Sequence, residues 1–207
     1  MRNLMAAPLV LGTHNRKKGL ELAALVAPLG IEVRTLADYP QAIVVVEDGE
    51  TFADNAHRKA VQQAVHLGAW VLGEDSGLVV DSLGGAPGVY SARYSGEGAT
   101  DESNNARLLA ELGTLPLERR AAHYVCWVVL ADPTGTAIAE VDGECHGRIL
   151  YEPRGSGGFG YDPLFEIPEY HHTFAELGTT VKGCLSHRAR ALRKLLPRLP
   201  ELLNAQR

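Results

Sequence analysis

Cysteine is scarce in this sequence, and its few positions indicate neither a cross-link nor a metal centre. The three cysteines, Cys126, Cys145 and Cys184, lie far apart and form no CxxC pair. A disulfide framework and a zinc site are therefore not indicated. Such cysteine usage is typical of a protein that works in the reducing cytoplasm, which is the compartment we expect for this chain.

A long apolar run and a basic surplus are also missing. No stretch approaches the roughly 18 consecutive apolar residues that a membrane helix requires, so we expect no association with a membrane. Residues 5–11 lead directly into a polar segment with no small-residue cleavage site, which favours a buried strand over a secretory signal. The formal net charge of -5 argues against a protein whose main task is to bind a nucleic-acid backbone, because such domains usually carry excess positive charge.

The composition and patterning are those of an α/β domain. Hydrophobic residues make up 45% and charged residues 22% of the 207 positions, which is enough apolar surface for a globular core. Strands are expected over residues 8–12, 70–72, 78–80, 124–130 and 138–141. Helices are expected over residues 18–29, after the Thr51 cap, after Thr100 and from about Ser186. With no internal repeat or low-complexity linker, residues 1–207 are predicted to form one domain whose two lobes enclose a cleft.

The first candidate site is a basic loop between the first strand and the first helix. It consists of Thr13, His14, Asn15, Arg16, Lys17 and Lys18. At such a junction the backbone N–H groups and the positive end of the helix favour a phosphate group. The loop lacks the second glycine and the Lys-Ser/Thr pair of a P-loop, so an ordinary ATPase is not indicated. A solvated basic first turn is the alternative interpretation.

Two acidic segments supply candidate ligands for a metal ion. Glu74 and Asp75 are adjacent in what is predicted to be a polar turn over residues 73–77, and Glu47 belongs to an acidic cluster before the second helix. Hard oxygen ligands on loops suit magnesium, which binds through one or two carboxylates together with substrate phosphates. A carboxylate that the metal does not use could take a proton from an attacking water. Plain turn chemistry and a charged helix entrance are the alternatives.

A glycine-rich segment is suited to holding a nucleobase, and the start of the last helix is rich in hydrogen-bond donors. Residues 155–163 place four glycines around two aromatic residues and an acid, so the backbone can approach a ligand closely while a ring stacks on it. A surface loop with two anchoring rings is the alternative. Lys182, His187 and Arg188 bring hydrogen-bond donors, which select anions or carbonyl oxygens. No GxSxG motif surrounds a serine, so a serine hydrolase is not indicated.

Six motifs, in this order along the chain, resemble those of the inosine triphosphate pyrophosphatase family. They are THNRKK at residues 13–18, EDGETFADNA at 47–56, EDSGL at 74–78, LGGAPGVYSARY at 83–94, GGFGYDP at 157–163 and SHR at 186–188. The resemblance extends from residue 9 to about residue 195. Six motifs in register over this length exceed what chance similarity produces.

The resemblance implies a fold, a reaction and an assembly. The implied fold is α/β, with a mixed β-sheet, flanking helices and two lobes around a central substrate cleft. The implied reaction is the Mg²⁺-dependent hydrolysis of deaminated purine nucleoside triphosphates, namely ITP, dITP and XTP, to the monophosphate and pyrophosphate. The implied assembly is a homodimer, with no nucleic acid as a partner.

The resemblance also assigns roles residue by residue. The basic loop would hold the triphosphate, Asp75 would be the general base and a metal ligand, and Ser76 would contact the substrate. Glu47 would complete the metal site, with Glu74 beside it. The pocket for the base would be lined by Phe159, Gly160, Tyr161, Asp162, Lys182, His187 and Arg188.

Two departures from the family pattern and two rival functions stay open. The family often has Asp-Asp where this chain has Glu74 and Asp75, which leaves the role of the longer Glu74 side chain undecided. His14 stands where a glycine is usual. One rival function is a pyrophosphatase for other modified nucleotides, pyrimidines included. The other is a non-catalytic nucleic-acid-binding module, which the acidic balance and the adjacent carboxylates disfavour.

Overall fold

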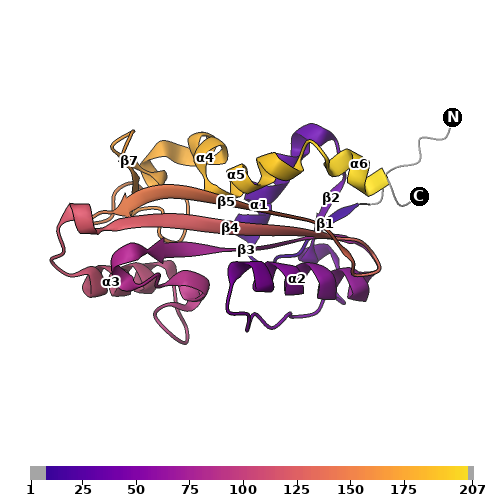
Figure 1. Ribbon diagram of the computed structural model, residues 1–207, viewed down its shortest axis with the longest axis horizontal. Coiled ribbons are helices and arrows are strands. Elements are labelled where there is room, and N and C mark those ends of the chain that lie inside the picture. Colours follow the sequence, from indigo (N-terminus) through magenta and orange to yellow (C-terminus); the bar gives the residue numbers. More distant parts are fainter. Residues whose placement is uncertain (1–7, 205–207) are drawn as a thin grey trace. The chain divides into compact units, whose positions relative to one another are not determined.

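The computed structural model describes residues 8–204 and has a mixed α/β fold (Figure 1). Seven strands form one sheet in the order β2-β1-β3-β4-β5-β6-β7. The strands are β1 Leu9–Leu11, β2 Val33–Thr35, β3 Trp70–Val80, β4 Ala121–Ala131, β5 Ala137–Ile149, β6 Phe165–Ile167 and β7 His172–Thr173. The α-helices are α1 Arg16–Val26, α2 Phe52–Leu67, α3 Asp101–Leu112, α4 Phe174–Leu185, α5 His187–Leu195 and α6 Leu199–Asn204. Short 3-10 helices cover Ala27–Leu29, Leu36–Asp38, Asp81–Leu83, Gly88–Arg93 and Leu117–Arg119.

Contacts within the chain divide it into two compact units. Unit 1 contains the described residues up to Asp75, Trp127–Gly143 and the described residues from Ala191 onward, and unit 2 contains Ser76–Cys126 and Glu144–Arg190. Each unit has a hydrophobic core cluster of its own. Among residues 8–204, no helix is long and apolar enough to cross a membrane. The N-terminal part of the stretch 5–11 considered above lies outside the described residues.

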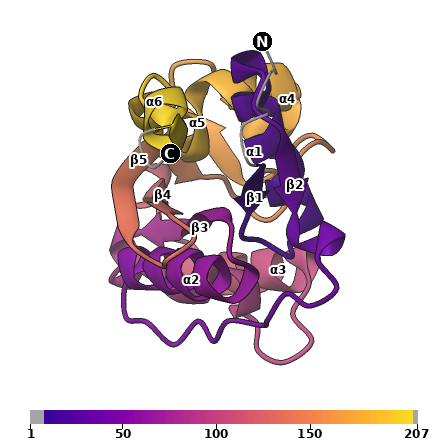
Figure 2. The same cartoon turned by 90° about the vertical axis from the view of Figure 1, so that its right-hand side faces the viewer.

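In unit 1, β1 pairs in parallel with both β2 and β3. Helices α2 and α6 lie on opposite faces of the sheet in this unit (Figures 1 and 2). The core between the strands and α2 is made of small and branched apolar side chains. Its fully buried members include Val10, Ala56, Ala60, Ala64, Val71 and Val129.

Helix α2 has the start, end and packing face that its sequence predicts. The Thr51 hydroxyl accepts a hydrogen bond from the Asp54 N–H at 3.1 Å, which caps the first turn, and Gly68 ends the helix with a φ of 60°. The alanine face lets the helix approach β3 closely. A Cβ added to Gly73 of β3 would lie 2.5 Å from the carbonyl oxygen of Ala56, so only glycine fits there.

In unit 2, β6 pairs antiparallel with both β5 and β7. Helices α3 and α4 lie on opposite faces of the strands in this unit (Figures 1 and 2). Its core is more aromatic than that of unit 1. The Tyr124 ring centroid lies 4.7 Å from that of Phe165, and the Phe165 centroid lies 5.5 Å from that of Phe174.

One expectation about this fold was wrong. Residues 73–77, predicted to be a polar turn between two strands, lie inside the single long strand β3. Glycine, acidic residues and serine in sequence are typical of a turn, but Glu74 and Asp75 are buried here, and each is paired with a lysine that offsets the cost of burying its charge. Tertiary contacts therefore override the local turn chemistry, and they place both carboxylates on a rigid strand.

The last two predicted helices are present near their expected positions. The helix after Thr100 is α3, and the last predicted helix is α5, where the Ser186 hydroxyl accepts from the Ala189 N–H at 3.2 Å. Helix α4 was not predicted. Its sequence contains Gly178 and Gly183 together with two threonines, all weak helix formers, and Gly178 interrupts the helix with a φ of 76°.

Candidate active site

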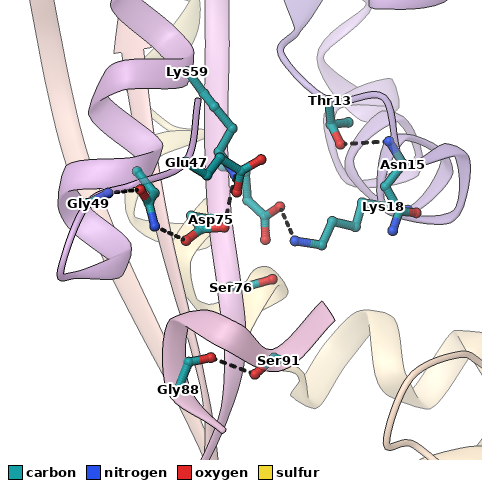
Figure 3. Close-up of polar contacts among 12 residues, drawn as sticks. Thr13, Asn15, Lys18, Glu47, Gly49, Lys59, Asp75, Ser76, Gly88 and Ser91 are labelled. Carbon is teal, nitrogen blue, oxygen red and sulfur yellow. Dashed lines mark hydrogen bonds and ion pairs between the residues drawn. The ribbon is translucent and has the colours of Figure 1, made fainter. Parts of the chain in front are cut away.

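The basic loop lies in unit 1, with Thr13, His14 and Asn15 between β1 and α1 and with residues 16–18 in the first turn of α1. Asn15 caps α1: its side chain accepts from the Lys18 N–H at 3.1 Å, and its own N–H donates to Thr13 Oγ1 at 3.1 Å (Figure 3). The first turn of α1 contains no acidic residue. The exposed members of the loop include His14, Arg16 and Lys17. A helix N-terminus with a basic first turn has the polarity that favours an anion.

A lysine between two carboxylates is the centre of the polar cluster in unit 1 (Figure 3). Lys59 Nζ lies 2.9 Å from Asp75 Oδ1 and 3.0 Å from Glu47 Oε2. Lys59 and Asp75 are buried, whereas Glu47 is partly exposed. Helix α2, strand β3 and the segment before α2 each supply one member of this cluster.

Burial and charge have opposite effects on the pKa of these groups. Burial by itself would lower the pKa of Lys59, but the charges of three neighbouring carboxylates outweigh burial, so this pKa is raised. Burial also raises the pKa of Asp75, against the opposing charges of Lys59 and Lys18. Lys59 is therefore cationic. The Asp75 carboxylate accepts a proton more readily than an exposed aspartate does, which is the property of a general base.

Glu74, the neighbour of Asp75 on β3, contacts a different cation. Lys18 Nζ lies 3.2 Å from Glu74 Oε2, and Glu74 is buried. Consecutive side chains of a strand point to opposite faces of the sheet. Glu74 therefore meets a lysine from α1 while Asp75 meets a lysine from α2.

Residues 41–49, called the strap below, carry Glu47 along α2. The strap forms no strand, and its Val44 and Val46 side chains are exposed. The side chains of α2 that contact it are Asn55, Arg58, Lys59, Gln63 and His66. Asn55, Arg58 and Lys59 hold the end of the strap that carries Glu47, whereas Gln63 and His66 contact its other end at Ile43 and Gln41.

In unit 2, the glycine-rich loop folds around Asp162. Its Oδ2 atom accepts from the Phe159 N–H at 2.9 Å and from Lys182 Nζ at 2.6 Å. Lys182 Nζ also lies over the Phe159 ring, 4.3 Å from its centroid. Gly158 has a φ of 76°, and a Cβ there would collide with the Asp162 carboxylate. Glycine at position 158 is therefore needed for both its backbone conformation and its lack of a side chain.

Two contacts connect the same loop to the rest of unit 2. The Tyr161 hydroxyl donates to the Ser91 carbonyl oxygen at 2.8 Å, and Asn105 Nδ2 donates to the Gly160 carbonyl oxygen at 3.0 Å. The Ser91 hydroxyl in turn accepts from the Leu78 N–H at 2.9 Å. It donates to the Gly88 carbonyl oxygen at 2.7 Å (Figure 3). The loop is thus fixed to α3 and to the 3-10 segment that precedes it.

The start of α5 places two predicted base-pocket residues in unit 2. The His187 ring stacks on the Tyr124 ring, with centroids 4.7 Å apart and an interplanar angle of 12°. Arg188 Nη2 donates to Ser76 Oγ at 3.2 Å. Both residues are buried. Arg188 and Ser76, both predicted to contact the substrate, are therefore in direct contact within unit 2.

The donor atoms in unit 1 fit magnesium bound together with a substrate. Glu47 and Asp75 present hard carboxylate oxygens to one shared cation, the Lys59 ammonium. Magnesium in nucleotide enzymes binds through one or two carboxylates and through substrate phosphates. Across residues 8–204, no three His, Cys, Asp or Glu side chains are grouped so as to hold a metal ion by themselves. The residues therefore fit a site that the substrate completes, and the metal role expected for Glu74 stays a prediction.

The predicted site residues divide between the two units. Unit 1 contains the basic loop, Glu47, Glu74 and Asp75, whereas unit 2 contains Ser76, the loop at 159–162 and the donors from α4 and α5. Within unit 1 the structure brings Glu47 to Asp75. Within unit 2 it brings Lys182 to Asp162 and Arg188 to Ser76.

The sequence interpretation missed two buried polar residues of α2, Asn55 and Lys59. A signal for them was present, because Asn55, Lys59 and Gln63 recur at every fourth position beside the alanine face of the helix. Residues four apart share one side of a helix. A polar stripe next to an apolar packing face indicates polar partners inside the fold, and all three residues are buried.

Comparison with known proteins identifies the family. The model of the Ham1 family matches residues 9–198. This chain belongs to the Ham1 family. A relative from Rhodopirellula baltica, named dITP/XTP pyrophosphatase, is 54% identical over 95% of this chain and 95% of its own length.

Solved structures of similar proteins agree with the Ham1 fold. A HAM1 protein from Coxiella burnetii has a TM-score of 0.85 and 35% identity, and the match covers 94% of this chain and 99% of that one. A nucleoside-triphosphatase / dITP/XTP pyrophosphatase from Mycobacterium abscessus has a TM-score of 0.74 and 41% identity over 93% and 99% of the two chains. The mixed sheet with flanking helices predicted from the sequence is confirmed.

Proposed function

We propose that this Ham1 family chain hydrolyses the deaminated purine nucleotides dITP, ITP and XTP to the monophosphate and pyrophosphate, thereby removing them from the nucleotide pool. Relatives from R. baltica and M. abscessus carry the name dITP/XTP pyrophosphatase. The structural observation that carries the proposal is the position of Lys59 between Glu47 and Asp75. Two carboxylates around one cation, beside a basic helix start, supply the groups that a magnesium-bound triphosphate requires.

Asp75 is the general base in this proposal. Burial raises the pKa of its carboxyl group, so the carboxylate can accept the proton of a water that attacks the α-phosphorus. Lys18 offsets charge on the phosphates next to the N-terminus of α1. Transfer reactions of this kind depend on positioning and charge neutralisation more than on covalent chemistry by the protein.

The proposed cofactor is Mg²⁺. Glu47 and Asp75 would hold it together with the substrate phosphates, where it would polarise the phosphate groups. Lys59 keeps the two carboxylates close together, which their like charges alone would oppose. Glu74, which contacts Lys18, would assist from the adjacent position on β3.

The base is selected by donors in unit 2. Lys182, His187 when protonated, and Arg188 only donate hydrogen bonds. Hypoxanthine and xanthine present an accepting carbonyl oxygen at the six position, whereas adenine presents a donating amino group. ATP should therefore be a very poor substrate, because donors facing its amino group would be left without acceptors.

The remaining wall of this pocket is the loop at 159–162. The Phe159 ring would stack on the purine, and Gly160, Tyr161 and Asp162 would shape the space beside it. GTP shares the six-position carbonyl, so its exclusion would depend on a contact with its two-amino group.

We also propose that the chain works as a homodimer, as the resemblance implies, and that it works in the cytoplasm, as its cysteine usage indicates. Light scattering coupled to size-exclusion chromatography tests the assembly. A monomer at the enzyme concentration used for turnover would contradict it.

A panel of nucleoside triphosphates with magnesium tests the proposed function. We expect rapid turnover of dITP, ITP and XTP and slow turnover of ATP, GTP and pyrimidine triphosphates. Equal turnover of dITP and ATP would refute the selectivity. Faster turnover of a modified pyrimidine would support the rival pyrophosphatase, and a gel shift with nucleic acid at physiological salt but no turnover would support a binding module.

A further inference from the structure

Asn55 contacts two parts of the proposed catalytic site at once, at Gly49 and at Asp75, both of which are labelled in Figure 3. Its Oδ1 atom accepts from the Gly49 N–H at 2.8 Å, in the strap that carries Glu47. Its Nδ2 atom donates to Asp75 Oδ2 at 3.3 Å. Asn55 is 1% exposed. One buried amide group therefore joins the strap to strand β3 inside unit 1.

These two contacts fix the orientation of the amide. If its oxygen and nitrogen were exchanged, the NH₂ group would face the Gly49 N–H and the oxygen would face the Asp75 carboxylate, so both contacts would become repulsive. Lys59 Nζ meets the other Asp75 oxygen, Oδ1, at 2.9 Å. Each carboxylate oxygen of Asp75 thus has one donor from α2, and the two donors together set the plane of the carboxylate.

The strap is shaped for this contact. A Cβ added to Gly49 would lie 2.7 Å from Asn55 Oδ1 and 2.7 Å from the Asp54 Cβ. Any larger residue would push the strap away from α2, so glycine at this position permits the N–H group to reach the amide.

We propose that Asn55 is a positioning residue that couples the strap to the general base. Through its acceptor it holds the segment that carries Glu47, and through its donor it orients the Asp75 carboxylate toward the attacking water. The inference rests on the proposed function. Because Asn55 contacts Gly49 and Asp75, and not the basic loop or the residues assigned to the base, its loss lowers turnover more than it weakens nucleotide binding.

Two substitutions of Asn55 separate its two contacts. Asn55→Asp keeps an acceptor for the Gly49 N–H but turns a carboxylate oxygen toward Asp75, and Asn55→Ala removes both contacts. We expect both to lower kcat for dITP at least about tenfold while KM stays within about threefold of the parent.

Hydrogen exchange at the Gly49 amide gives a readout that is independent of turnover. Exchange should accelerate in Asn55→Ala, which has no acceptor at this place. It should stay near the parental rate in Asn55→Asp, whose carboxylate still accepts. Equal exchange rates in the parent and Asn55→Ala would overturn the coupling to the strap.

Gln63 provides the matched control. It is also an amide on α2, it is also 1% exposed, and its Nε2 atom donates to the Ile43 carbonyl oxygen of the same strap. Gln63→Leu should lower the thermal unfolding temperature about as much as Asn55→Ala but leave kcat within about threefold of the parent.

Two results would overturn the proposal. One is a parental kcat in folded Asn55→Asp and Asn55→Ala, and the other is an equal loss of kcat in Gln63→Leu. If the parent enzyme itself fails to hydrolyse dITP, the proposed function is wrong, and the exchange rate of the Gly49 amide then decides whether Asn55 holds the strap.

Discussion

At the scale of single residues, Asp75 carries the chemistry of this account. Asp75→Asn keeps the size of the side chain but removes both the proton acceptor and the negative charge for magnesium. We expect kcat for dITP to fall at least about a hundredfold, in the range seen when a general base is lost. Circular dichroism should show that the variant is folded. A folded variant within about threefold of the parental kcat would move the role of base to Glu74 or Glu47.

A substitution of Lys182 tests whether its ion pair with Asp162 stabilises the loop at 159–162. Its ammonium group lies 2.6 Å from Asp162 Oδ2, and both side chains are buried. In Lys182→Met the cation opposite a buried carboxylate is gone, so the free energy of unfolding in urea should fall by about 3–5 kcal/mol. Adding Asp162→Asn should recover part of that loss. A double variant as unstable as the single one would show that the ion pair is not the cause.

At the scale of elements, the approach of α2 to β3 is the contact that positions Asn55 and Lys59. A Cβ at Gly73 would meet the backbone of α2 at Ala56 and Ala60, neither of which is a flexible side-chain end. Gly73→Ala should therefore lower the free energy of unfolding by about 1–3 kcal/mol and reduce kcat, because α2 must move away from Asp75.

Gly183 supplies the matched control for this substitution. It lies in α4, and an added Cβ there meets nothing within 4 Å. Gly183→Ala should leave kcat unchanged and raise the free energy of unfolding by about 0.5–1 kcal/mol, since alanine favours a helix interior more than glycine does. Urea unfolding of both variants checks the pair, and equal effects would contradict the close approach at Gly73.

Strand β3 also shows how far the sequence could predict this fold. Apolar periodicity located α2, α3 and α5, whose caps at Thr51, Thr100 and Ser186 are local signals. The strand through Glu74 and Asp75 was not predictable in this way, because the partners of its buried carboxylates, Lys18, Lys59 and Asn55, come from helices distant in the sequence. The motifs identified the carboxylates, but their partners Lys59 and Asn55 required the tertiary structure.

At the scale of the whole molecule, buried tyrosines of unit 2 predict a loss of stability at high pH. Burial raises the pKa of Tyr161, and burial together with Glu111 raises the pKa of Tyr94 to about 12. Tyrosines in the unfolded chain lose their protons near pH 10. The folded state therefore binds more protons above that pH, and the free energy of unfolding decreases as the pH rises from about 10 toward 12.

A Tyr161→Phe variant isolates this effect from other alkaline transitions. Its free energy of unfolding, measured in urea, should fall less steeply between about pH 9.5 and pH 11 than that of the parent. Identical slopes for the parent and the variant would show that Tyr161 does not contribute to the pH dependence.

Attack of water on the α-phosphorus is tested most directly by identifying which phosphate bond the whole enzyme cleaves. Phosphorus NMR of dITP with magnesium and enzyme follows each phosphate without a coupled assay. A water that attacks the α-phosphorus, activated by Asp75, must release dIMP and pyrophosphate together in equal amounts from the first turnover. The appearance of dIDP and orthophosphate as the first products would contradict this account, even if dITP disappeared quickly.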